Sequence, residues 1–212
     1  MIRLSKVKDN KITILIPVFE EPEIVAKFVD ENKSILKRYP VFVLNKKGGA
    51  ILKEYTSFYK KSSCPTIGWP LGSSRKFLIR RVQTEFSLNL DVDTILPPDF
   101  VNEALKKLND PKVGAIALDY ENPQGHLAFG PSLWRTKVLQ KLYDYSFWKP
   151  KCECIYMWNK LHRANLKVET LNKKAKHLKL LGDSIRQNKA GFLDYLWNIF
   201  ISIAAKFKKI VY

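Results

Sequence analysis

Apolar runs alternate with segments of helical periodicity along the first 118 residues. The runs predicted as strands are short and mostly apolar, as expected for strands buried on both faces, and cover residues 12–18, 41–44, 86–90 and 113–118. The helical segments lie between them, at residues 22–37, 50–61, 75–84 and 100–108. This alternation predicts an α/β fold with a mostly parallel central sheet flanked by helices. In open sheets of this kind, ligands bind at the carboxyl ends of the strands.

The pattern after residue 118 is less regular. It predicts a short strand at 126–129, helices at 132–143 and 152–164, and a strand at 167–171. From residue 191 onward, polar residues recur about every fourth position and leave a broad apolar face, which predicts a C-terminal amphipathic helix. We therefore divide the chain into a domain at 1–185 and an amphipathic segment at 186–212. That segment would lie on an anionic membrane, which its lysines favour, or dock on protein.

Charge and cysteine content indicate the kind of partner and the cellular compartment to expect. The chain has 37 lysines and arginines against 20 acidic residues, a formal charge of +17, which favours anionic partners. Three cysteines are an odd number for a disulfide framework and favour a reducing compartment. The first residues lack the apolar core of a signal peptide. We expect a cytoplasmic protein, peripheral at the inner face of a membrane.

The sharpest chemical feature is Asp91-Val92-Asp93, at the end of a predicted strand. Carboxylates two residues apart in an extended chain point toward one side. Mn²⁺ and Mg²⁺ prefer oxygen ligands, and they take some of these from substrate phosphate and water. Asp91 and Asp93 are therefore candidate ligands of a divalent cation that neutralises a departing diphosphate.

Two long segments, in order, resemble the family 2 inverting glycosyltransferases. The opening ITILIPVFEEPEIVAKFVDEN follows the family's first strand and nucleotide-facing loop, and LGSSRKFLIRRVQTEFSLNLDVDTILPPDF follows its helix and D-x-D strand. The resemblance covers roughly residues 11–185 and is strongest up to about 103. It implies the GT-A fold, a nucleotide-sugar donor, and Mn²⁺ or Mg²⁺. A UDP-sugar is favoured and a GDP-sugar is the alternative, so the predicted enzyme is a hexosyltransferase.

The resemblance also implies which residues bind the donor. Asn45 stands where the family has a base-binding aspartate, and an amide offers both a donor and an acceptor, which leaves the base undetermined. The residues matching the nucleotide-binding positions are Pro17, Phe19, Glu20, Glu21, Asn45, Gly72, Arg75 and Asp91.

An inverting transfer needs a general base for the acceptor hydroxyl. PKCECIYMWNKLHRANLKVETL resembles the family's acidic helix start, with Glu153 at the first acidic position and Cys154 in place of the second. Glu153 is the predicted base, and Asp144 and Glu121 are the reserves. A late histidine, His177, is the predicted third metal ligand beside Asp91 and Asp93. The acceptor would be a saccharide, a lipid-linked group or a protein.

Other classes of protein remain open. A basic nucleic-acid-binding protein would explain the charge but not the D-x-D, and no specific nucleic-acid motif is present. A nucleotidyltransferase of similar fold would need a glycine-rich, arginine-containing opening loop that the sequence lacks. A catalytically inactive nucleotide-sugar-binding protein is the third alternative, because Asn45 and Cys154 replace acidic residues.

Overall fold

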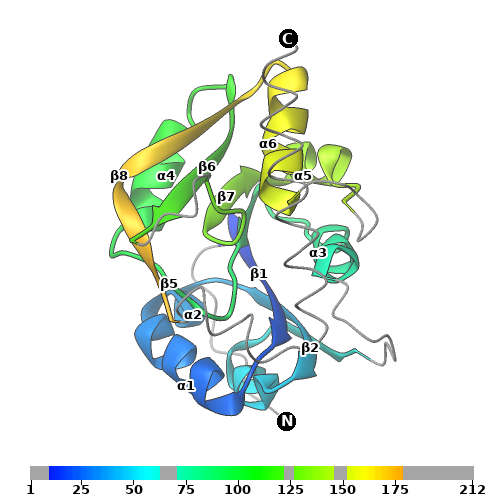
Figure 1. The fold of residues 1–212 in the computed structure, drawn as a ribbon, viewed down its shortest axis with the longest axis vertical. Coiled ribbons are helices and arrows are strands. Elements are labelled where there is room, and N and C mark those ends of the chain that lie inside the picture. Colours follow the sequence, from blue (N-terminus) through cyan, green and yellow to red (C-terminus); the bar gives the residue numbers. More distant parts are fainter. Residues whose placement is uncertain (1–9, 63–70, 122–126, 146–151, 179–212) are drawn as a thin grey trace.

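A curled eight-stranded sheet organises the chain in the computed structural model, which describes residues 10–62, 71–121, 127–145 and 152–178 (Figure 1). The strand order is β3-β2-β1-β4-β7-β6-β8-β5. β7 runs antiparallel to both of its neighbours, and β5 runs antiparallel to β8, while the other pairs are parallel. The strands are β1 Ile12–Phe19, β2 Val41–Lys47, β3 Phe58–Lys61, β4 Phe86–Asn89, β5 Thr94–Ile95, β6 Val113–Tyr120, β7 Ser132–Arg135 and β8 Lys167–His177.

Helices cover both faces of the sheet and bury two separate clusters of apolar side chains. The helices are α1 Pro22–Glu31, α2 Lys33–Arg38, the 3₁₀ helix η1 Gly49–Tyr55, α3 Leu71–Ile79, α4 Phe100–Lys107, α5 Thr136–Leu142 and α6 Glu153–Arg163. α1, α2, η1 and α4 pack on one face, against residues such as Ile14 and Ile16 of β1. α3, α5 and α6 pack on the other face, against Leu15 and Trp134 (Figure 1).

The parallel strands predicted from apolar runs are confirmed, at β1, β2, β4 and β6. The helix predicted at 50–61 is wrong, because the chain forms the short η1 and then β3, which pairs with β2 at the edge of the sheet. The helix predicted at 132–143 begins only at Thr136, because Ser132–Arg135 pairs with both β4 and β6. The strand predicted at 126–129 is absent from its described part, 127–129.

The helix predicted at 22–37 is divided at Asn32. The Asn32 amide donates to the carbonyl oxygens of Phe28 and Thr94, both at 3.0 Å, and its Oδ1 accepts from the Leu96 amide at 3.2 Å. Asn32 therefore separates α1 from α2 and connects them to β5 and to Leu96, the residue after it. No local pattern predicts the contacts with Thr94 and Leu96, because these partners lie more than 60 residues away in the chain.

The predicted C-terminal amphipathic segment at 186–212 lies outside the described residues, as does the predicted boundary at 185. Within the part of the chain that the structure describes, no helix is both long enough and apolar enough to cross a membrane.

Candidate active site

Asp91 and Asp93 come just after β4, beyond Leu90, at the edge where β1, β2 and β6 also end. Leu88 on β4 and Leu90 just after it pack on the α1 and α4 side of the sheet, so Asp91, one position on, faces the layer of α3 and α6. The predicted placement of the D-x-D at the carboxyl end of a buried strand is confirmed. The Asp91 side chain is 30% exposed and that of Asp93 is 16% exposed, so both carboxylates still reach solvent.

Arg75, on α3, lies between two carboxylates. Its Nη2 donates to Asp91 Oδ1 at 2.6 Å, and its Nε forms an ion pair with Glu153 Oε2 at 3.1 Å. Its side chain is 3% exposed, and the guanidinium carbon lies 5.2 Å from the centre of the Phe129 ring. Burial opposes the charged form, but the carboxylates of Asp91 and Glu153 outweigh it and raise the pKa of Arg75. Arg75 is therefore a permanent, fixed cation inside the site.

Glu153 is the first residue of α6 and lies deep in the site. Its Oε1 accepts a hydrogen bond from the Tyr143 hydroxyl, and its side chain is 10% exposed. Burial raises the pKa of Glu153, although Arg75 and the Tyr143 hydrogen bond act in the opposite direction. Burial likewise raises the pKa of Asp91, against the effect of Arg75. Glu153 and Asp91, 62 positions apart in the sequence, thus share one arginine.

His177 reaches Asp93 through the pairing of β5 with β8, in which Thr94 lies opposite His177. The His177 Nε2 and Asp93 Oδ2 atoms are 3.2 Å apart. Tyr120 packs edge-on against the imidazole, with ring centres 4.9 Å apart, and its hydroxyl lies 2.8 Å from Thr94 Oγ1. A carboxylate and an imidazole at this distance suit Mn²⁺. The described residues contain no cluster of three or more His, Cys, Asp or Glu side chains in metal-binding geometry.

Gly130 allows the chain to pass close beside Asp91. A β-carbon at position 130 would lie 2.1 Å from Asp91 Oδ2. The sequence pattern alone does not predict this close approach, because positions 91 and 130 lie far apart in the chain.

The predicted nucleotide-facing loop meets the end of β2. The Glu21 carboxylate forms an ion pair with Lys47, and the Glu20 amide donates to the Lys47 carbonyl at 3.4 Å. Gly48 has φ +78° and lies so close that a β-carbon there would be 1.9 Å from the Glu20 carbonyl oxygen. The Lys46 ammonium lies 5.4 Å from the centre of the Phe19 ring. The loops after β1 and β2 therefore contact each other, at the same edge of the sheet as the carboxylates.

Three other predicted donor-binding residues have contacts inside the protein. Pro17 is buried within β1, opposite Leu44. The Asn45 side-chain nitrogen donates to the Tyr59 hydroxyl at 2.6 Å, and its oxygen accepts from the Gly49 amide at 3.1 Å. The position that a β-carbon would take at Gly72 lies 2.7 Å from Tyr145 Cδ1. A contact between these residues and a nucleotide stays a prediction.

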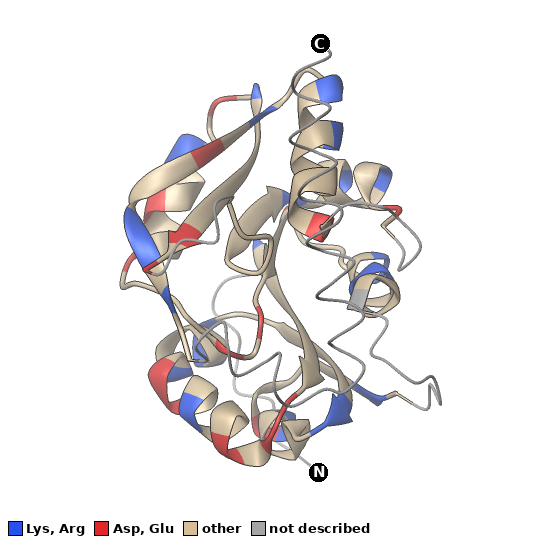
Figure 2. Cartoon of the chain, in the orientation of Figure 1, with Lys and Arg blue, Asp and Glu red and all other residues tan. Residues whose placement is uncertain are grey.

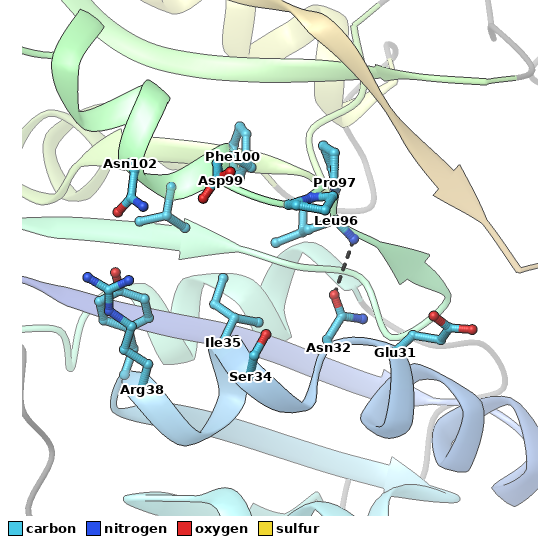
Figure 3. Close-up of a pocket in the computed structure, with 13 residues that line it drawn as sticks. Glu31, Asn32, Ser34, Ile35, Arg38, Leu96, Pro97, Asp99, Phe100 and Asn102 are labelled. Atoms are coloured by element: carbon cyan, nitrogen blue, oxygen red, sulfur yellow. Dashed lines mark hydrogen bonds between the residues drawn. The ribbon is translucent and has the colours of Figure 1, made fainter.

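A pocket of about 320 Å³ lies elsewhere, between α1–α2 and the loop leading into α4 (Figure 3). Its walls include Arg38, Pro97 and Asp99, and Asn32 points from one side toward the Leu96 backbone. None of the predicted site residues lines this pocket. It therefore lies apart from the carboxylate site.

No family model matches the sequence, and no curated protein matches it either. Solved structures do match in fold. A mannosyltransferase from Pyrobaculum calidifontis, in complex with GDP-Man and Mn²⁺, is 13% identical with a TM-score of 0.66, over 81% of this chain and 57% of that chain. Glucosyl-3-phosphoglycerate synthase from Mycobacterium tuberculosis, in complex with Mn²⁺ and UDP-glucose, is 14% identical with a TM-score of 0.59, over 87% and 78%.

A third match is S. aureus TarS 1-349 in complex with UDP-GlcNAc, 10% identical with a TM-score of 0.58, over 80% of this chain and 59% of that chain. The chain thus spans less than two thirds of the mannosyltransferase and of TarS. At these identities the likeness concerns the fold. The chain has the GT-A fold of nucleotide-sugar transferases, as the resemblance implied.

Proposed function

We propose that the protein is a metal-dependent glycosyltransferase that moves a sugar from a nucleotide-sugar donor to an acceptor hydroxyl. The observation that carries the proposal is the convergence of Asp91, Asp93, Arg75, Glu153 and His177 at the carboxyl edge of a GT-A sheet. These residues come from four separate elements of the chain, and the loops after β1 and β2 lie at the same edge of the sheet. The matched structures with bound GDP-Man, UDP-glucose and UDP-GlcNAc support a UDP- or GDP-sugar as donor.

The donor atoms at the site fit Mn²⁺ or Mg²⁺. Asp93 and His177 offer an oxygen and a nitrogen 3.2 Å apart, and Asp91 offers the second carboxylate. A bound divalent cation would neutralise charge on the departing nucleoside diphosphate. The exposed fractions of Asp93 and His177, 16% and 20%, leave room for diphosphate oxygens and water to complete the coordination.

Inversion, the acceptor and membrane association are further parts of this proposal. Inversion follows from the family resemblance and requires a carboxylate base near the acceptor, for which the sequence suggests Glu153. The acceptor would be a saccharide, a lipid-linked group or a protein. The cationic, amphipathic segment at 186–212 supports a position at an anionic membrane surface, where a lipid-linked acceptor is available.

The test is release of nucleoside diphosphate from UDP- and GDP-sugars, with Mn²⁺ or Mg²⁺ and with or without solubilised membrane lipid. We expect metal-dependent release that Asp93→Ala abolishes. Asp110→Ala is the matched control, because Asp110 is exposed and precedes β6 at the opposite, amino edge of the sheet.

Two other outcomes would favour other functions. Metal-dependent nucleotide binding without release would indicate an inactive nucleotide-sugar-binding protein. Absence of both, together with salt-dependent binding of oligonucleotides, would reject the transferase and favour the nucleic-acid alternative.

A further inference from the structure

Four side chains form a continuous buried chain of polar contacts across the site. The Tyr143 hydroxyl donates to Glu153, Glu153 pairs with Arg75, and Arg75 donates to Asp91. Tyr143, Arg75 and Glu153 are all nearly inaccessible to solvent, and Asp91 stands at the open end. The sequence assigned two separate roles here, a nucleotide contact for Arg75 and the base for Glu153.

Both carboxylate oxygens of Glu153 are engaged by other side chains inside the protein. A base must lie within hydrogen-bond reach of the acceptor hydroxyl. One oxygen of Glu153 accepts from Tyr143, the other is 3.1 Å from the Arg75 Nε, and the side chain is 10% exposed. Both oxygens are therefore directed into the protein.

Arg75 holds Asp91 in one place. A guanidinium is planar and rigid, so fixing its Nε against Glu153 also fixes where its Nη2 points. The Phe129 ring lies against the guanidinium, and Phe129 also packs on Tyr143, with ring centres 5.8 Å apart. On the far side of Asp91, Gly130 leaves no room beyond its Oδ2. The carboxylate is confined between Arg75 and the Gly130 backbone.

We propose that Glu153 and Arg75 are positioning residues that hold Asp91 for the divalent cation and the diphosphate, and that Glu153 is not the base. This inference rests on the proposed function, because it concerns the same site. One cation shared by Asp91 and Glu153 leaves a net negative charge, and Asp93 adds another, so the arrangement still attracts a divalent cation.

The experiment compares Glu153→Gln with Glu153→Ala. The first variant, E153Q, keeps an oxygen for Arg75 and a polar contact for Tyr143, whereas E153A leaves Arg75 without its anchor. We measure Mn²⁺-dependent affinity for UDP and GDP by calorimetry, and the rate and pH profile of nucleoside diphosphate release. E153A should weaken Mn²⁺-dependent binding by about tenfold or more, E153Q should restore most of it, and E153Q should release product within about tenfold of the wild-type rate.

A general base predicts the opposite pattern. Loss of a base typically slows turnover by about 10²–10⁴-fold, so E153Q would nearly abolish release, remove the acidic limb of its pH profile and leave Mn²⁺-dependent binding unchanged. That result would overturn the inference.

Arg75→Lys provides a second test that keeps the positive charge. A fold check by circular dichroism accompanies each variant. Since lysine lacks the planar fork that bridges two carboxylates, R75K should also weaken Mn²⁺-dependent binding; unchanged binding in R75K would contradict us.

The measurement of Mn²⁺-dependent nucleotide binding tests this inference separately from the proposed function. A wild-type protein that binds Mn²⁺ and UDP or GDP without releasing product would refute the transferase, while E153A and R75K would still test whether Asp91 is positioned through Arg75. A wild-type protein that binds neither nucleotide with Mn²⁺ would reject both.

Discussion

Replacing Gly130 with alanine tests whether the position of the Asp91 carboxylate matters. A β-carbon at Gly130 would lie 2.1 Å from Asp91 Oδ2 and 2.7 Å from its Cγ, whereas ordinary contacts begin at 3.4 Å. The carboxylate must therefore move by about 1.3 Å, the difference between 3.4 and 2.1 Å. Because the carboxylate is confined between Gly130 and Arg75, it must turn out of the space between them. A turn of that size breaks the 2.6 Å hydrogen bond from Arg75, because hydrogen bonds of this kind extend to only about 3.2 Å.

The expected effect is large on activity and small on stability. A misplacement of about 1 Å in a catalytic group can cost about 10²-fold in rate, so G130A should lower nucleoside diphosphate release by about that factor. The displaced atoms end a side chain that is 30% exposed, so they can turn toward solvent. We expect the free energy of unfolding to fall by only about 1–2 kcal/mol, and the melting temperature by about 2–8 °C.

Gly114→Ala is the matched control for this variant. A β-carbon at Gly114 would lie 2.6 Å from Leu161 Cδ1 in the core under α6, away from Asp91. Overpacking there should cost about 1–3 kcal/mol, as much as G130A or more, without changing activity at a temperature where the protein stays folded. If folded G130A released product and bound Mn²⁺ with UDP within about twofold of wild type, the position of Asp91 would be irrelevant and our reasoning would fail.

Individual contacts lead to three further predictions. Asn32→Ala removes two buried hydrogen bonds and one partly buried one, and should lower the free energy of unfolding in urea by about 2 kcal/mol. Ser34→Ala, at an exposed position in the same pocket, should change it little. His177→Gln should weaken Mn²⁺-dependent UDP binding by at least about tenfold and leave metal-free binding unchanged; equal losses in both would exclude His177 as a ligand. Because burial raises the pKa of Glu153 above its ordinary 4.5, the folded protein holds this proton more tightly than the unfolded chain. The free energy of unfolding of the wild type, compared with that of E153Q, should therefore fall as pH rises from about 4.5 through the raised pKa. We measure the urea midpoint of both proteins across this pH range, and a wild-type midpoint that rises relative to that of E153Q would contradict the prediction.

The sequence predicts well the strands that are buried on both faces. It predicts poorly the short strands that form only because they pair with adjacent strands. The run ITILIPV needs no partner to be recognised as a strand, and β1 forms there. Phe58–Lys61 and Ser132–Arg135 are only four residues long, and their strand character depends on pairing with β2, or with β4 and β6. Short-range periodicity does not contain this information, so both segments resembled parts of helices.

The same distinction applies to the site. Asp91 and Asp93 are evident because a strand ending in two carboxylates is a local pattern. The partners of Arg75 are not evident, because they depend on how α3 and α6 pack over one face of the sheet. Family resemblance placed Arg75 and Glu153 near the site, but only the packing shows that they pair with each other.

The site joins two layers of the molecule through the segment 91–93. Asp91 is held by Arg75 and Glu153, which belong to the helices on one face of the sheet. Figure 2 shows basic positions on α3 and both acidic and basic positions on α6. Asp93 is held from the other side of the site by β8, since its carbonyl accepts from the Leu178 amide at 2.7 Å and its carboxylate lies beside His177. A slip of one residue between β5 and β8 would turn His177 to the opposite face of the strand. On the proposed function, metal binding at Asp93 and His177 would depend on the packing around Arg75, because only one residue separates the two carboxylates.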